Sequence, residues 1–199
     1  LMRSSAASMC IRDRSMEELS SVSIDDEKAG ETIVDYLIEH GHTKIAEIGA
    51  NLELSQTARL RHNGYLNSLK KHGITPDERY YERARFSYDS AYRAMKKLLE
   101  KDIEITAVYA ISDVMAIGAL RAILDKGLRV PEDISITGFD GSTLAEYYNP
   151  KIVSIRQPHK DMAARSVELL FNMIDLHKGS CHEIIPFELT EGKSVARID

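Results

Sequence analysis

The stretch from residue 105 to residue 140, ITAVYAISDVMAIGALRAILDKGLRVPEDISITGFD, decides the fold class. It opens with a nearly continuous apolar run, residues 105–111, which is typical of a strand covered on both faces of a parallel sheet. Residues 113–126 follow with a helical pattern that Gly127 ends. After a turn, residues 133–139 form a second strand. A strand, a helix and a strand in this order predict two parallel strands joined by a right-handed crossover.

The same alternation of patterns extends to both sides of this unit. The remaining predicted elements are helices near residues 29–38, 57–72, 90–101 and 159–177, and strands near residues 44–49, 80–85, 151–156, 183–189 and 194–198. We therefore expect an α/β protein with an open parallel sheet flanked by helices.

The composition excludes several classes of protein. Of 199 residues, 43% are hydrophobic and 29% charged, as is usual for a globular protein in water. The net charge of -5 argues against a broad nucleic-acid surface. Two cysteines, Cys10 and Cys181, imply no disulfide framework and favour the reducing cytoplasm. Apolar runs are too short to cross a bilayer, and the first residues, LMRSSAAS, lack the apolar core of a secretory signal.

The first residues have a different origin in our interpretation. Residues 4–8 and 9–14 back-translate, with one base dropped between them, to a transposon adapter used in preparing sequencing libraries. We hypothesise that residues 1–14 are translated adapter and that the native protein extends upstream of Ser15. The alternative is a native disordered tail, and the nucleotide sequence distinguishes the two.

Polar and aromatic side chains follow the predicted strands, at the edge where open parallel sheets bind ligands. They are Gln56, Thr57, Arg59 and Arg61 after the first strand, Phe86 after the second, Ser112 and Asp113 after the third, and Asp140 after the fourth. A guanidinium, carboxylates, hydroxyls and a ring suit a small polyhydroxylated or heterocyclic ligand.

Each of these residues also has a purely structural interpretation. Asp113 is placed to cap a helix, and Asp140 to close an Asx-turn before Gly141. Phe86 could belong to the core, and Arg61 to a solvated helix face. Residues 113–126 are apolar nearly all round, which leaves a dimer contact and a deeply buried helix open as alternatives.

Sequence signals for chemistry are weak. Phosphate-binding loops of the G-x-G-x-x-G or G-x-x-x-x-G-K-[ST] type and the G-x-S-x-G nucleophile motif are absent from the sequence. We interpret His40-Gly41-His42 as a surface turn rather than a metal site. His177, Cys181 and His182 have no evident partners. We expect neither an enzyme nor a protein that needs a metal or cofactor.

Several blocks, in order and spacing, resemble the lactose/galactose repressor (LacI/GalR) family of transcription regulators. They are residues 36–46 (YLIEHGHTKIA), 112–122 (SDVMAIGALRA), 127–140 (GLRVPEDISITGFD) and 155–158 (IRQP). The resemblance runs from about Leu19 to Arg197, and the third block is the most specific. It implies a sensor of two lobes, like type I periplasmic sugar-binding proteins, behind a helix-turn-helix head.

On this resemblance the chain divides between the two lobes. Residues 15–26 are expected to be a strand remnant of the amino-side lobe, and residues 27–153 the carboxyl-side lobe. Residues 154–180 are expected to form a crossover and a helix of the amino-side lobe, and residues 181–199 strands that return to the carboxyl-side lobe.

The resemblance also assigns roles by position. Arg61 matches the arginine that grips the effector, Phe86 an aromatic that packs on it, and Asp140 an acid that accepts hydrogen bonds from it. Gln157 lies at a lobe crossing near the pocket. Ser112 stands at an effector-contacting position where many members carry asparagine, and Gly141 where many carry a second acid. The expected dimer contacts, from the helix at Asp113 and the loop 142–150, are Met115, Ala119, Ala122 and Tyr147.

The expected function is effector sensing, with a sugar as the effector, in a cytoplasmic homodimer. Such a regulator would reach operator DNA only through a head upstream of this chain. The first alternative is the periplasmic sugar-binding component of a transporter, for which the complete gene would encode a signal peptide instead of a helix-turn-helix. The second is an α/β enzyme, which turnover of a bound ligand would reveal.

Overall fold

The computed structural model describes residues 20–176 and 181–198, with side chains up to residue 172 in the first range. The adapter hypothesis for residues 1–14, Cys10 and His177 therefore lie outside the described residues.

The main body is built on a parallel sheet of four strands. These are β2 (Ile45–Gly49), β3 (Tyr81–Arg83), β4 (Ala107–Ala110) and β5 (Ser135–Thr137), in the order β3-β2-β4-β5. Every residue of β2, β4 and β5 is buried, as expected for strands covered by helices on both faces. The predicted α/β class with an open parallel sheet is confirmed.

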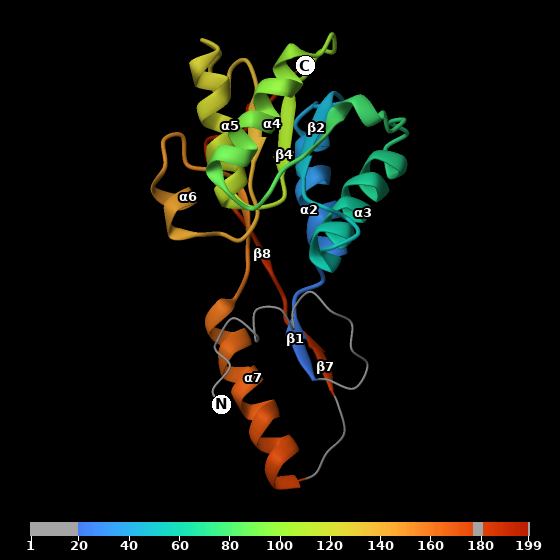
Figure 1. Cartoon of the computed structure of the whole chain (residues 1–199), viewed down its shortest axis with the longest axis vertical. Helices are drawn as coiled ribbons and strands as arrows, with labels where there is room; N and C mark the ends of the chain where they lie inside the picture. Colours follow the sequence, from blue (N-terminus) through green and yellow to red (C-terminus); the bar gives the residue numbers. More distant parts are fainter. Residues whose placement is uncertain (1–19, 177–180, 199) are drawn as a thin grey trace.

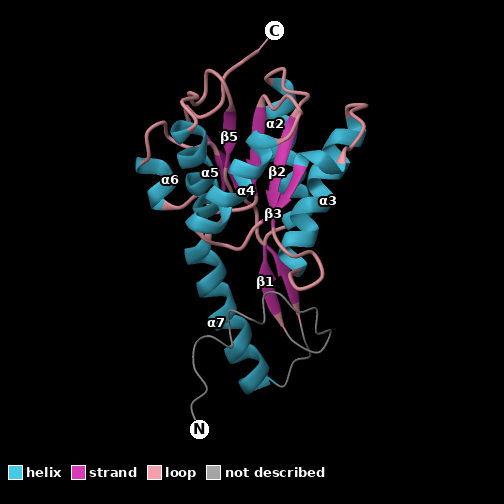
Figure 2. Cartoon of the chain, turned by 45° about the horizontal axis from the view of Figure 1, so that its top comes forward, coloured by secondary structure: helices cyan, strands magenta, loops and turns pink. Residues whose placement is uncertain are grey.

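Two pairs of helices flank this sheet. α2 (Asp26–Glu39) packs against α3 (Gln56–Lys71), and α4 (Tyr88–Glu100) packs against α5 (Asp113–Asp125), as Figures 1 and 2 show. A 3-10 turn, η1 (Glu78–Tyr80), precedes β3, and the short α6 (Thr143–Tyr147) follows β5. The predicted helix boundaries agree to within about three residues. The strand expected at residues 80–85 is shorter: η1 takes its first residue, and β3 ends at Arg83.

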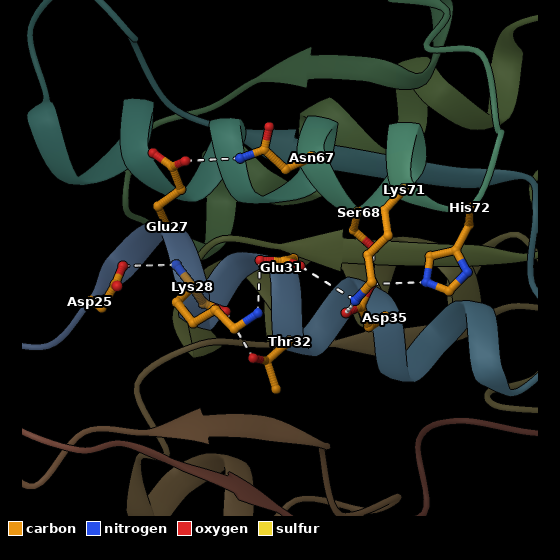
Figure 3. A network of polar contacts seen from close by, with 10 residues as sticks. All are labelled: Asp25, Glu27, Lys28, Glu31, Thr32, Asp35, Asn67, Ser68, Lys71 and His72. Carbon is orange, nitrogen blue, oxygen red and sulfur yellow. Dashed lines mark hydrogen bonds and ion pairs between the residues drawn. The ribbon is translucent and has the colours of Figure 1, made fainter.

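The interface of α2 and α3 is unusually close, and two glycines allow it. A Cβ on Gly30 would lie 2.7 Å from the carbonyl oxygen of Arg61, and one on Gly64 would lie 2.2 Å from that of Glu27. Polar contacts join the exposed edges of the two helices (Figure 3). Asp35 accepts hydrogen bonds from Ser68 Oγ at 2.6 Å and from Lys71 Nζ at 2.7 Å. The start of α2 thus packs closely on the middle of α3, and the second half of α2 is bonded to the end of α3.

A smaller part extends away from the main body (Figure 1). It consists of β1 (Ser21–Ser23), which pairs in parallel with β7 (His182–Ile184), and α7 (His159–Leu176), which contacts β1. β6 (Ser154–Arg156) and β8 (Glu188–Thr190) form an antiparallel pair beside the main sheet. The chain passes between the two parts three times, after β1, after β6 and after β7.

The carboxyl-terminal strands differ from the sequence prediction. The segment 183–189 is two strands because Pro186, which has no N–H to donate, interrupts it. β7 joins β1 in the smaller part, and only β8 returns to the main body. The strand predicted at residues 194–198 is absent from the described structure. This segment is held by isolated bonds, among them Ala196 N–H to Ser135 Oγ at 2.9 Å.

His42 is not in a surface turn, as the sequence suggested, but is 1% exposed. Its ring nitrogens lie 3.1 Å from Thr106 Oγ1 and 3.1 Å from the carbonyl oxygen of Ala196. The carboxyl-terminal segment covers the end of α2 and encloses the ring. Burial lowers the pKa of His42, because the charged imidazolium loses its hydration.

The structure decides between the two alternatives for α5. Met115, Ala119 and Ala122 are at most 2% exposed within this single chain, because α4, α6 and the sheet surround the helix. Their prediction as dimer contacts was therefore wrong, and the apolar character of α5 reflects burial. Tyr147, the fourth predicted contact, is 82% exposed on α6.

Candidate functional site

Arg61 is the centre of the site and lies on α3, six residues after the Ser55 cap. Its side chain is 3% exposed, so the interpretation as a solvated arginine is wrong. Nε donates to Asp26 Oδ1 at 2.8 Å and Nη1 donates to the carbonyl oxygen of Ile111 at 2.6 Å. The guanidinium carbon lies 3.5 Å from the centre of the Phe139 ring. The start of α2, the end of β4 and the end of β5 thus hold one planar cation.

Asp140 follows β5 and closes the other side of the guanidinium. One of its carboxylate oxygens, Oδ1, lies 3.6 Å from Arg61 Nη1 and accepts a hydrogen bond from Gln157 Nε2 at 2.7 Å. The backbone of Asp140 has φ 119°, a conformation that costs energy in a residue with a side chain. The N–H that an Asx-turn would use, on Ser142, donates to Asp113 instead. The Asx-turn alternative is therefore wrong, and the side chain of Asp140 belongs to the site.

The helix cap that the sequence suggested at Asp113 is at Ser112 instead, and Asp113 has a structural role between loops. The N-cap of α5 is Ser112, whose Oγ accepts from Met115 N–H at 3.3 Å. Asp113 accepts from Ser142 N–H and from Ser154 Oγ, each at 2.6 Å, and so joins the loops after β4 and β5 to β6. Burial raises the pKa of Asp113, and these hydrogen bonds oppose the rise.

Phe86 lies in the loop after β3, at the same edge of the sheet, because β3 runs parallel to β2. Its side chain is 51% exposed, so the core alternative is wrong. Among the described residues, Arg61, Asp140 and Gln157 form one connected group, and Ser112 is the neighbour of Ile111, which Arg61 contacts. No described hydrogen bond or ring contact joins Phe86 to this group, and its role remains a prediction.

Asp26 and Phe139 belong to the site but were missed as site residues. Phe139 lies within the third sequence block beside Asp140, where a ring next to an expected ligand group was a usable signal. Asp26 precedes the first strand of the main sheet, so a search of residues after strands passes over it. The only sequence signal for Asp26 was the pair of acids Asp25-Asp26. Such a pair is also expected at a helix start, where Asp25 is the cap and accepts from Lys28 N–H at 2.9 Å.

A second buried polar group lies between the sheet and α3. Glu47 is fully buried on β2, and its Oε2 lies 2.6 Å from His62 Nδ1 on α3. Burial raises the pKa of Glu47, although His62 opposes the rise. Burial lowers the pKa of His62, but contact with Glu47 outweighs this and the pKa is raised. His62 follows Arg61 directly, so α3 is fixed to the sheet beside the site.

The described residues hold no group of three or more histidine, cysteine, aspartate or glutamate side chains arranged for a metal ion. Among the helices of the described part, none combines the length and the apolar character that a membrane span requires.

Comparison with known proteins identifies the family. Residues 34–195 match the periplasmic binding protein-like domain. The chain is 41% identical over 179 residues, 90% of its length, to the HTH-type transcriptional regulator MalR of Clostridium butyricum. It is 36% identical over 173 residues, 86% of its length, to the HTH-type transcriptional repressor CytR of Escherichia coli K12. These matches span 53% and 50% of the two relatives, so the chain spans about half their length.

Solved structures agree with the sequence matches. The transcriptional regulator CelR in complex with cellobiose superposes with a TM-score of 0.85 at 34% identity, covering 89% of this chain and 54% of CelR. A LacI family regulator from Enterococcus faecium with bound ribose superposes with a TM-score of 0.86 at 27% identity, covering 94% of this chain and 69% of that one. The chain thus belongs to the periplasmic binding protein-like domain family.

Proposed function

We propose that this chain is the effector-sensing part of a DNA-binding transcription regulator and that its effector is a sugar. The observation that carries the proposal is the position of the Arg61 group beside the chain crossings. Asp26 comes three residues after β1, and Gln157 directly follows β6. A ligand held by Arg61 and Asp140 would therefore touch the segments that set the angle between the lobes.

Such a site can couple two distant events. A ligand that binds one lobe arrangement more tightly shifts the population toward it, and the shift changes the spacing of any DNA-binding heads attached to the lobes. In this proposal Arg61 and Asp140 hold polar groups of the sugar, Gln157 joins them from the crossing, and Phe86 covers an apolar face of the sugar ring. Ser112 follows β4, and its role as the cap of α5 orients its hydroxyl.

The relatives support a sugar and a regulator rather than a transporter or an enzyme. CelR was solved with cellobiose and the Enterococcus faecium regulator with ribose, and the curated relatives are transcriptional regulators. Because a regulator of transcription acts on the chromosome, we place this one in the cytoplasm. Operator DNA would be bound by a helix-turn-helix head and not by this chain.

We also propose a homodimer, through a surface that differs in part from the one first predicted. The exposed apolar side chains near the end of α5 and on α6 are Leu124, Leu144 and Tyr147, at 44%, 48% and 82% exposure. Exposed apolar side chains on helices that pack together, as α5 and α6 do, are available for a protein contact. Tyr147→Ser should shift the intact regulator from dimer toward monomer in sedimentation velocity, and an unchanged dimer would exclude this surface.

The test of sugar sensing uses Arg61→Lys with Arg59→Lys as its control. Lysine keeps the charge but cannot span Asp26, Ile111 and Asp140 with one planar group, whereas Arg59 is exposed on the same helix. Calorimetry of the intact regulator with cellobiose and ribose, followed by fluorescence anisotropy on operator DNA, should show the sugar response lost in Arg61→Lys and kept in Arg59→Lys. A normal response in Arg61→Lys would refute the role of Arg61.

A further inference from the structure

The charge of Arg61 is already balanced before any ligand arrives. Its Nε and the Asp26 carboxylate form an ion pair at 2.8 Å, with the two side chains 3% and 7% exposed. An ion pair shielded from water in this way is weakly screened by salt. The guanidinium therefore has little net positive charge left to attract an anion.

The group that faces solvent is acidic. The side chain of Asp140 is 34% exposed, compared with 3% for Arg61, and lies 3.6 Å from Nη1. Around one guanidinium there are thus two carboxylates, and the more accessible of them is the one that an incoming ligand meets first. A carboxylate accepts hydrogen bonds from hydroxyls but repels phosphate or carboxylate groups.

Acidic side chains also outnumber basic ones around Tyr109, in the interior behind the site. Tyr109 on β4 is the cross-strand neighbour of Glu47, and its hydroxyl has no hydrogen-bond partner among the described residues. Burial raises the pKa of Tyr109 well above its ordinary value. Arg61 opposes this rise, and the carboxylates of Glu47, Asp26 and Asp140 add to it. Of the charged side chains that shift the pKa of Tyr109, three are acids and one is a base.

We infer that the site accepts an uncharged polyol and rejects phosphorylated or carboxylated sugars, and that Asp26 sets this selectivity by neutralising Arg61. Asp26 acts as a positioning and charge-balancing residue, because its carboxylate is turned to Arg61 and is nearly closed to solvent. The inference rests on the proposed sugar-sensing function and adds the chemical class of the effector.

The decisive variant is Asp26→Asn, with Asp25→Asn as its matched control. Asparagine keeps an oxygen that can accept from Arg61 Nε but removes the charge. Asp25 is the exposed neighbour at the same helix end, and asparagine caps a helix as well as aspartate does. Both variants lose one negative charge from adjacent positions in the chain, but only Asp26→Asn unmasks Arg61.

The probes are inorganic phosphate, ribose and ribose 5-phosphate, titrated into the intact regulator by calorimetry. At an effective dielectric constant of about 20, removal of one charge near the ligand should tighten phosphate binding by about tenfold or more in Asp26→Asn. Asp25→Asn and the wild type should both bind phosphate weakly, and Asp26→Asn should move the preference from ribose toward ribose 5-phosphate. Asp140→Asn, a change on the solvent side of the same guanidinium, should move it in the same direction.

The outcomes separate this inference from the proposed function. Phosphate binding to the wild type as tight as to Asp26→Asn, or an equal gain in Asp25→Asn, would overturn the inference. If neither ribose nor ribose 5-phosphate binds the wild type but phosphate binding still rises only in Asp26→Asn, the charge balance is confirmed and the choice of ribose as a probe fails. If Asp26→Asn gains no phosphate affinity, the selectivity does not come from Asp26, whatever sugar is bound.

Discussion

Gly64→Ala tests whether the close packing of α2 on α3 holds the site together. The added methyl would lie 2.2 Å from the carbonyl oxygen of Glu27, 2.6 Å from the amide nitrogen of Glu31 and 2.9 Å from the carbonyl carbon of Gly30. All three are backbone atoms and cannot turn aside as a side chain can. The helices must therefore separate by about 1 Å to reach ordinary contact distance.

The net cost follows from two opposing effects. Alanine favours a helix over glycine by about 1 kcal/mol, which would stabilise an isolated helix. Forcing an additional methyl into a packed interface costs about 1–3 kcal/mol, and rigid backbone neighbours place this site at the upper end. We expect the free energy of unfolding to fall by about 2 kcal/mol, the difference of these two terms.

The same displacement should weaken the site. Arg61 lies one turn before Gly64, and its 2.8 Å bond to Asp26 spans the two helices. A separation of about 1 Å takes this pair beyond hydrogen-bond distance. Sugar affinity should therefore fall together with stability.

Gly73→Ala provides the control, measured by urea unfolding and by sugar titration. Gly73 has φ +72° and open space around it, so alanine there strains the backbone without moving a helix. Stability should fall in both variants, but sugar affinity only in Gly64→Ala. If Gly64→Ala is as stable as the wild type, or if both variants lose affinity equally, the packing argument is refuted.

Two further predictions concern buried titratable groups. The pKa of His42 is lowered on folding, so its contribution to stability is complete above the unfolded pKa near 6.5 and falls as the pH drops below that value. Urea unfolding midpoints at pH 5.5 and 7.5 should show this loss of stability in the wild type and a smaller loss in His42→Gln. The pKa of His62 is raised on folding, so its contribution to stability is present below about pH 6.5 and is lost as the pH rises through the folded pKa. The pKa of Glu47 is also raised, which lowers stability as the pH rises above about 4.5. His62→Leu alone leaves a buried carboxylate without its partner and should cost about 3–5 kcal/mol, whereas adding Glu47→Leu should restore or exceed wild-type stability and flatten this pH dependence. Equal stability of the single and double variants in urea titrations would contradict the pairing.

Several site residues could be predicted from the sequence because they follow parallel strands. Once residues 45–49, 107–110 and 135–137 are parallel strands, the residues that follow them must lie at one edge. Arg61 and Asp140 therefore came together as expected. The interruption at Pro186 was also visible in the sequence, since a strand through a proline lacks one ladder bond.

Other features depend on contacts between segments far apart in the chain. The Asp26–Arg61 pair requires the distance between α2 and α3, which Gly30 and Gly64 set jointly and which neither helix shows alone. His42 is buried by a segment more than a hundred residues later, whose own strand pattern was misleading. The apolar surface of α5 fitted both a core helix and an interface, and only its position beneath α4 and α6 decides between them.

In the proposed sensor, Arg61 connects the ligand to the chain crossings. The guanidinium is held by Asp26 just after one chain crossing and, through Asp140, by Gln157 just after another. A hydroxyl that takes the place of Gln157 on Asp140, or that draws Asp140 away from Arg61, therefore changes the bonds that hold the crossings themselves. In this proposal, the bonds that hold the ligand also hold the segments that connect the lobes. Substitutions of Asp140 or Gln157 should therefore alter effector affinity and operator response together. Phe86 lies outside this set and offers the contrast, because its loss should lower affinity while a saturating effector still produces the full response.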